Sequence, residues 1–101
     1  MNSIVFQSIF DAVTDSPQEA SELETRGDLM ISIRDIINDK EWTQKEAAEI
    51  LGLTQPRVSD LKNGKIEKFS IDLLMTCLYR VGFRFQPRYV NHTLTMNVQS
   101  V

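Results

Sequence analysis

The sequence predicts a mainly helical fold, a helix-turn-helix bundle with an amino-terminal helical extension and a short C-terminal β element. Two observations carry this prediction. Residues 16–81 place apolar side chains at helical spacing between capping residues and glycines, whereas residues 83–99 alternate apolar and polar side chains. We therefore divide the chain into an acidic extension (1–24), a helix-turn-helix domain (25–82) and a β tail (83–101).

Length and composition fit one globular domain. The chain has 101 residues, of which 42% are apolar and 25% charged, enough for one modest core. No apolar run approaches the roughly 20 residues that span a bilayer, and the amino terminus lacks the order of a signal peptide. A single cysteine, Cys77, excludes an internal disulfide and a multi-cysteine zinc site. We expect a cytoplasmic protein with no membrane segment, no metal and no cofactor.

The charges are unevenly distributed along the chain. Net charge is −3, but residues 1–24 hold five acidic and no basic side chains, and residues 54–90 hold seven basic and three acidic ones, a local +4. Attraction to phosphate depends on the local field, so the acidic total does not exclude nucleic acid. The acidic extension has its own partner, shields the basic region, or is simply a solvated helix, and the sequence leaves these open.

Each predicted helix after the first begins at a residue that can cap it. A side-chain oxygen at that position accepts a hydrogen bond from an N–H in the first turn, and a glycine after the last turn tolerates the positive φ that ends a helix. The predicted helices cover residues 4–13, 16–39, 43–52, 54–63 and 70–81, with Ser16, Thr43, Thr54 and Ser70 as N-caps and Gly52 and Gly82 as stops.

Residues 43–63, TQKEAAEILGLTQPRVSDLKN, predict two short helices joined by a tight turn. Ala48 is small enough for the second helix to cross closely, and Gly52 suits the turn. Val58 and Leu61, three apart, hold the second helix against the body. The side chains left away from the core can meet base edges or phosphates: Gln55, Arg57, Ser59 and Lys62. This pattern predicts DNA binding.

After Gly82 the apolar period changes from about four to two. Two strands are expected around Asn91-His92, a usable two-residue hairpin turn, and Pro87 pushes the first strand toward an edge. A lone two-stranded ribbon is marginally stable in water, so it packs on the helices or pairs with a second subunit. The tail is therefore the candidate dimer element, and the sequence leaves open whether it pairs within or between subunits. Arg84 and Arg88 share a strand face and could touch DNA or the acidic extension; the sequence favours neither.

Residues 29–81 resemble the Cro/lambda-repressor-type (Xre-like) helix-turn-helix family, and LTQPRVSDLKNGK is similar to its recognition helix and following loop. The acidic extension, the DSPQEA helix start and the β tail resemble HigA-type antitoxins and their stand-alone relatives. The resemblance implies a lambda-repressor-like fold and a dimeric repressor that binds an operator in its own promoter. Antitoxin members also bind and neutralise a toxin protein, which by analogy implies a toxin partner here.

The resemblance also implies roles for single residues. Gln44 matches a residue that contacts phosphate and buttresses the next glutamine, and Gln55 matches one that reads adenine. Asn63, Gly64 and Lys65 match a loop that offers main-chain N–H groups and a cation to phosphate. The sequence departs from the family at Pro56 and Asp60, which leaves specificity open there. The predicted DNA-binding set is Gln44, Thr54, Gln55, Arg57, Ser59, Lys62, Asn63 and Lys65.

Each of these assignments has a plainer alternative. Gln55 is otherwise an exposed polar residue, Arg57 a surface partner of Asp60, and the lysines solvated charges. Cys77 is expected in the core and His92 in a turn. No Gly-rich phosphate loop, metal cluster or nucleophile–base pair stands out, so we expect no enzyme and no catalytic residue.

Three functions are consistent with the whole chain. The leading one is a sequence-specific repressor that acts as a homodimer on a palindromic operator in double-stranded DNA, as the autoregulating antitoxin of a toxin–antitoxin pair. The alternatives are a stand-alone regulator without a toxin, and a protein-interaction module whose main task is to neutralise a toxic enzyme.

Overall fold

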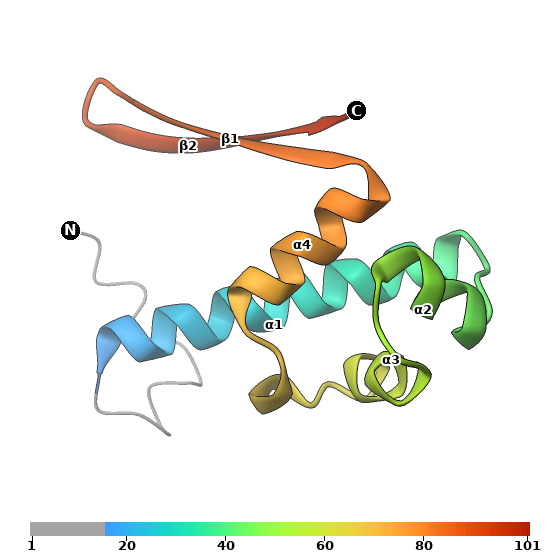
Figure 1. The fold of residues 1–101 in the computed structure, drawn as a ribbon. Coiled ribbons are helices and arrows are strands. Elements are labelled where there is room, and N and C mark those ends of the chain that lie inside the picture. Colours follow the sequence, from blue (N-terminus) through green and yellow to red (C-terminus); the bar gives the residue numbers. More distant parts are fainter. Residues whose placement is uncertain (1–15) are drawn as a thin grey trace.

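The computed structural model describes residues 16–101, so the short helix expected over residues 4–13 lies outside the described part of the chain. Four helices are followed by one antiparallel hairpin (Figure 1), which confirms the predicted fold class. The elements are α1 (Pro17–Asp39), α2 (Gln44–Leu51), α3 (Gln55–Lys62), the 3-10 turn η3 (Ile66–Lys68), α4 (Ile71–Val81), β1 (Phe83–Val90) and β2 (Thr93–Ser100).

The predicted caps are in place. Thr43 and Glu46 form a reciprocal capping box at the start of α2, with distances of 3.1 Å and 2.9 Å. Gly52 (φ 72°) and Gly82 (φ 106°) end α2 and α4 in the left-handed conformation that favours glycine. The four hydroxyls that accept a hydrogen bond from a backbone N–H of the first turn belong to Ser16, Thr43, Thr54 and Ser70.

The core lies where α1, α2, α3 and α4 meet. Val58 and Leu61 point inward from α3 with 0% and 1% of their surface exposed, as predicted. Ala48, a small residue of α2, is also buried. Cys77 is confirmed as a core residue, and burial raises the pKa of its thiol. The core side chains are Met30, Ile33, Ile37, Ala47, Ala48, Leu51, Val58, Leu61, Phe69, Leu74, Cys77 and Leu78, with Trp42 packed against them.

The hairpin has two chemically different faces. Asn91 and His92 both adopt positive φ (53° and 62°), as a type I′ turn requires, so His92 is a turn residue as predicted. The register Phe85↔Val98, Pro87↔Met96, Tyr89↔Leu94 gathers the larger apolar side chains on one face. The other face carries Arg84, Gln86, Arg88, Thr95, Asn97 and Gln99.

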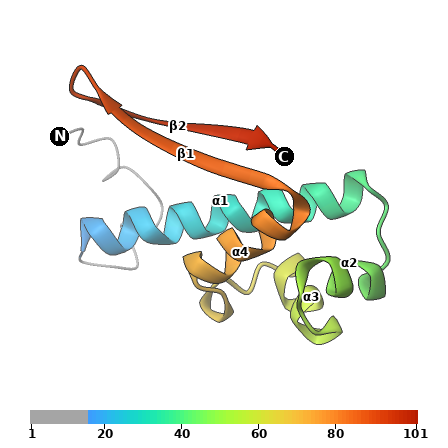
Figure 2. The same cartoon turned by 45° about the horizontal axis from the view of Figure 1, so that its top comes forward.

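Only the near end of the hairpin packs on the helices. Phe83 and Phe85 contact the core, and the Phe85 ring meets the Tyr79 ring edge-on at 6.0 Å. At the far end Tyr89 and Leu94 are 70% and 68% exposed. Figures 1 and 2 show the hairpin leaving the end of α4 on the side of the molecule opposite α3. Its exposed apolar face is therefore well separated from the predicted DNA-binding helix.

Candidate nucleic-acid interface

The turn between α2 and α3 is fixed by tertiary contacts as well as by its backbone. The Gln44 side-chain amide donates to the main-chain carbonyl of Gln55 at 2.9 Å, which joins the first turns of the two helices. At Gly52 a Cβ atom would lie 2.7 Å from Cζ of Arg80, so the Arg80 guanidinium lies directly over the turn. The two helices are thus held at one angle, and the predicted buttressing role of Gln44 has a geometric basis.

The outer face of α3 is polar and open. With Val58 and Leu61 turned inward, Gln55 and Lys62 are exposed at opposite ends of the helix. Thr54 is exposed too, and its hydroxyl accepts from the N–H of Arg57 at 3.3 Å. Ser59 is half-buried, and its Oγ lies 3.5 Å from Nδ2 of Asn63. Of the predicted residues within α3, Gln55 and Lys62 are therefore the exposed ones.

Arg57 is engaged within the protein. Its Nη2 donates to the main-chain carbonyl of Lys68 at 3.0 Å, and its guanidinium carbon lies 4.9 Å from the centre of the Phe69 ring. Phe69 is itself only 1% exposed. Arg57 therefore ties α3 to the segment that leads into α4. A contact between Arg57 and DNA stays a prediction. The structure adds a second role, in which Arg57 positions α3 against this segment.

Asp60 forms ion pairs with two lysines that follow α3 in the chain. Its carboxylate oxygens lie 3.9 Å from Nζ of Lys65 and 3.5 Å from Nζ of Lys68. The expected alternative paired Asp60 with Arg57, but within residues 16–101 its ion pairs are these two lysines. Asp60 thus holds part of the positive charge on which phosphate attraction would depend.

The loop after α3 differs from the expectation in one respect. The resemblance implied main-chain N–H groups open to phosphate at residues 63–65. In the structure the N–H groups of Asn63, Gly64 and Lys65 donate to carbonyls of Ser59, Leu61 and Asp60 at 2.9, 3.1 and 3.0 Å. They close the end of α3, as helix C-termini commonly do. What this loop can offer to phosphate is therefore its exposed side chains, those of Asn63 and Lys65.

The sequence matches the family described as "Helix-turn-helix domain" over residues 12–88, most of the chain. The protein belongs to this helix-turn-helix family. Membership implies DNA binding, in agreement with the open polar face of α3, and domains of this family are typically non-enzymatic. No curated protein matches the chain.

Across residues 16–101 no three or more His, Cys, Asp or Glu side chains are grouped so that they could hold a metal ion. In the same residues no helix is long and apolar enough to cross a membrane.

Proposed function

We propose that this helix-turn-helix protein is a sequence-specific transcriptional repressor that places α3 in the major groove. The observation that carries the proposal is the geometry of Gln55, exposed in the first turn of α3 and held by the 2.9 Å bond from Gln44 to its main chain. Recognition helices contact base edges with their first residues, and a glutamine amide matches the N6 and N7 atoms of adenine. A repressor of this kind acts in the cytoplasm, where its promoter lies.

The remaining polar side chains of the interface would contact the DNA backbone. Lys62, Asn63 and Lys65 follow one another from the last turn of α3 into the loop, next to where a groove-bound helix meets phosphates. Gln44, Thr54 and Ser59 lie beside the first turn and the middle of α3. Phosphate contacts release counterions, so affinity should fall steeply with added salt.

A DNA-binding experiment tests the base-reading assignment. Binding of the full chain to the DNA upstream of its own gene is compared with binding to random DNA, for the wild type and for Gln55→Ala. The loss of a bidentate contact to a base costs about 1–3 kcal/mol of discrimination, roughly a tenfold loss or more on the promoter. Gln18→Ala is the matched control, because Gln18 is also an exposed glutamine in the first turn of a helix. Equal affinities for the promoter in both variants would exclude Gln55 as the base contact.

We further propose that two copies pair through the apolar face of the hairpin. This proposal is supported by the exposed apolar side chains at the far end of the hairpin. Tyr89, Leu94 and Met96 are 70%, 68% and 55% exposed and lie on one face. A monomer leaves these side chains in water, whereas a second copy would cover them. Two recognition helices could then enter adjacent major grooves, about 34 Å apart on a palindromic operator.

The molar mass in solution tests the dimer. Leu94→Glu with Met96→Glu places two charges on the apolar face, and Thr95→Glu with Asn97→Glu places two charges on the polar face of the same strand. We expect the first pair to give a monomer and the second pair to remain dimeric by light scattering. A dimer that survives the first pair, or a chain cut after Gly82 that stays dimeric, would move the interface elsewhere.

The second candidate function is that of an antitoxin, as the resemblance to HigA-type proteins implies. The specific observation in its favour is the charge of residues 1–24, five acidic side chains and no basic one, which suits a basic partner. Removal of residues 1–24, which hold all five of these acidic side chains, should abolish binding to the product of a neighbouring small basic gene and should leave promoter binding intact. Unchanged binding of that product would exclude this segment as the toxin site.

A further inference from the structure

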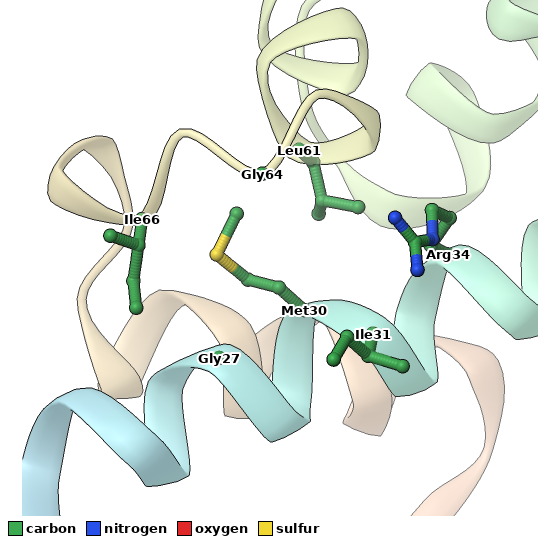
Figure 3. Close-up of a pocket in the computed structure, with 7 residues that line it drawn as sticks. All are labelled: Gly27, Met30, Ile31, Arg34, Leu61, Gly64 and Ile66. Atoms are coloured by element: carbon green, nitrogen blue, oxygen red, sulfur yellow. The ribbon is translucent and has the colours of Figure 1, made fainter. Parts of the chain in front are cut away.

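A hollow lies between α1 and the loop that follows α3 (Figure 3). It has a volume of about 270 Å³. One wall comes from α1 (Gly27, Met30, Ile31, Arg34) and the other from Leu61, Gly64 and Ile66. A cavity of roughly 150 Å³ is large enough for a benzene ring, so this one has room for a ring with a short polar arm. Its lining is aliphatic except at Arg34.

Arg34 is a cation without a partner at this hollow. Within residues 16–101 it makes no hydrogen bond or ion pair, and the residues three and four positions away on α1 are Met30, Ile31, Ile37 and Asn38, none of them acidic. Figure 3 shows its guanidinium at one end of the hollow, with Ile66 at the other. Arg26, by contrast, is occupied, since it bonds to Glu22 at 2.8 Å and to the carbonyl of Ile66 at 3.4 Å. The available positive charge is therefore that of Arg34.

Gly27 forms part of the floor, and its place in the helix needs an explanation. Glycine is a poor residue for a helix interior, and Gly27 lies near the middle of α1. Packing does not demand it, because a Cβ atom there would lie 3.7 Å from Cδ1 of Ile66, an ordinary contact. The missing side chain keeps the floor of the hollow open.

We infer that this hollow binds a small organic acid with an apolar body, whose carboxylate pairs with Arg34 and whose ring or chain lies over Gly27 against Met30 and Ile66. A guanidinium binds a carboxylate through two parallel hydrogen bonds, and aliphatic walls favour the apolar remainder. If the proposed repressor function holds, such a ligand would touch Leu61 and Gly64 beside the phosphate-contacting loop, and so would affect operator binding. The ligand site itself does not depend on that function.

A titration without DNA tests the site. The isotope-labelled full chain is titrated with phenylacetate and followed by NMR. We expect saturable shifts at Gly27, Gly64 and Ile66, with a Kd of about 1 mM or below. The neutral analogue 2-phenylethanol should bind about tenfold more weakly, because it lacks the charge-assisted pair. Absence of saturation with phenylacetate and also with hexanoate, or shifts that map to the hairpin, would overturn the inference.

Three variants locate the binding. Arg34→Met keeps the length of the side chain and removes its charge, and we expect phenylacetate to bind about tenfold more weakly. Arg84→Met removes the same charge from the hairpin and should bind as the wild type does. Gly27→Leu fills the floor and should abolish the shifts. Wild-type affinity in Arg34→Met or in Gly27→Leu would exclude this hollow as the site.

Discussion

The helical body, residues 16–82, and the hairpin, residues 83–101, place their apolar side chains in opposite ways. Every fully buried apolar side chain of the described residues lies in the body, among them Ile33, Leu61 and Phe69 at 1% exposure or less. The hairpin leaves Tyr89, Leu94 and Met96 more than half exposed. The body thus completes its own core, whereas the far end of the hairpin has an apolar face that the chain itself does not cover.

This difference indicates that the helical body and the hairpin have different roles. The body has to hold α2 and α3 at one angle, and it does so with a closed core, capped helices and the contacts of Gln44 and Arg57. The hairpin packs against α4 and lies on the side of the molecule opposite α3 (Figures 1 and 2). Changes in the two regions should therefore have separable effects on stability, on DNA binding and on assembly.

The largest expected effect comes from truncating the same residue type in each region. Leu61→Ala opens a cavity in a closed core and should lower the free energy of unfolding by about 2–5 kcal/mol. Leu94→Ala removes a side chain that is 68% exposed, and the expected loss for the monomer is below about 0.5 kcal/mol. Urea unfolding at a protein concentration low enough to keep the chain monomeric measures both. Losses of equal size would mean that the hairpin is part of the same core.

Backbone strain gives the next largest effect. Gly52→Ala puts a Cβ atom at φ 72° and 2.7 Å from the guanidinium carbon of Arg80, so the variant should lose about 1–3 kcal/mol of stability. The hairpin has left-handed residues of its own, of which His92 has φ 62°. His92→Gly relieves a conformation instead of straining one, and its stability should stay within about 0.5 kcal/mol of the wild type. Thermal melts distinguish the two, and a Gly52→Ala protein as stable as the wild type would show that the turn can readjust.

Much of both regions could be predicted from the sequence, because the decisive signals are local. The caps at Ser16, Thr43, Thr54 and Ser70 act on N–H groups three residues away, and Gly52 and Gly82 act on their own φ. The turn at Asn91-His92 and the period of two in the strands are local as well. Helical spacing alone places Val58 and Leu61 inward and Gln55 outward.

The features that were not predicted from the sequence depend on contacts between residues that are distant along the chain. Arg57 bonds to the carbonyl of Lys68, eleven positions on, and Asp60 pairs with Lys68 across a turn whose shape no periodicity specifies. The N–H groups of residues 63–65 turn inward because the end of α3 closes on itself, which analogy to a loop sequence did not reveal. The hollow beside Gly27 depends on the approach of α1 to this loop, a tertiary fact. Local patterns report neighbours along the chain, and these contacts are not between such neighbours.

The helical body and the hairpin differ in charge as well as in burial. In the body Asp60 lies within 4 Å of two loop lysines, whereas the hairpin holds Arg84 and Arg88 and no acidic residue. If α3 is the recognition helix, Asp60→Asn should release both lysines toward phosphate and raise DNA affinity by about fivefold at moderate salt. Arg84→Gln with Arg88→Gln should leave affinity unchanged.

Asp35→Asn controls for total charge in that experiment, because Asp35 is an exposed carboxylate on α1 and the substitution removes the same charge. Fluorescence anisotropy on labelled promoter DNA over a range of salt concentrations gives the affinities and their salt slopes. A loss of affinity in Asp60→Asn would instead mean that Asp60 accepts a hydrogen bond from a cytosine amine, as a carboxylate in the major groove can. A loss in the hairpin double variant would place that region at the DNA too.

The smallest expected effect is a gain, and it too belongs to the body. Gly27→Ala adds a methyl group at ordinary contact distance from Ile66, at 3.7 Å, and replaces a poor helix former within α1. The unfolded chain loses freedom while the helix keeps its geometry, so stability should rise by about 0.5–1 kcal/mol. Gly82→Ala is the opposite case in the same body, since φ 106° admits no alanine without strain and stability should fall. Urea midpoints measure both, and a Gly27→Ala protein less stable than the wild type would show that α1 and the loop are packed more tightly than the 3.7 Å contact indicates.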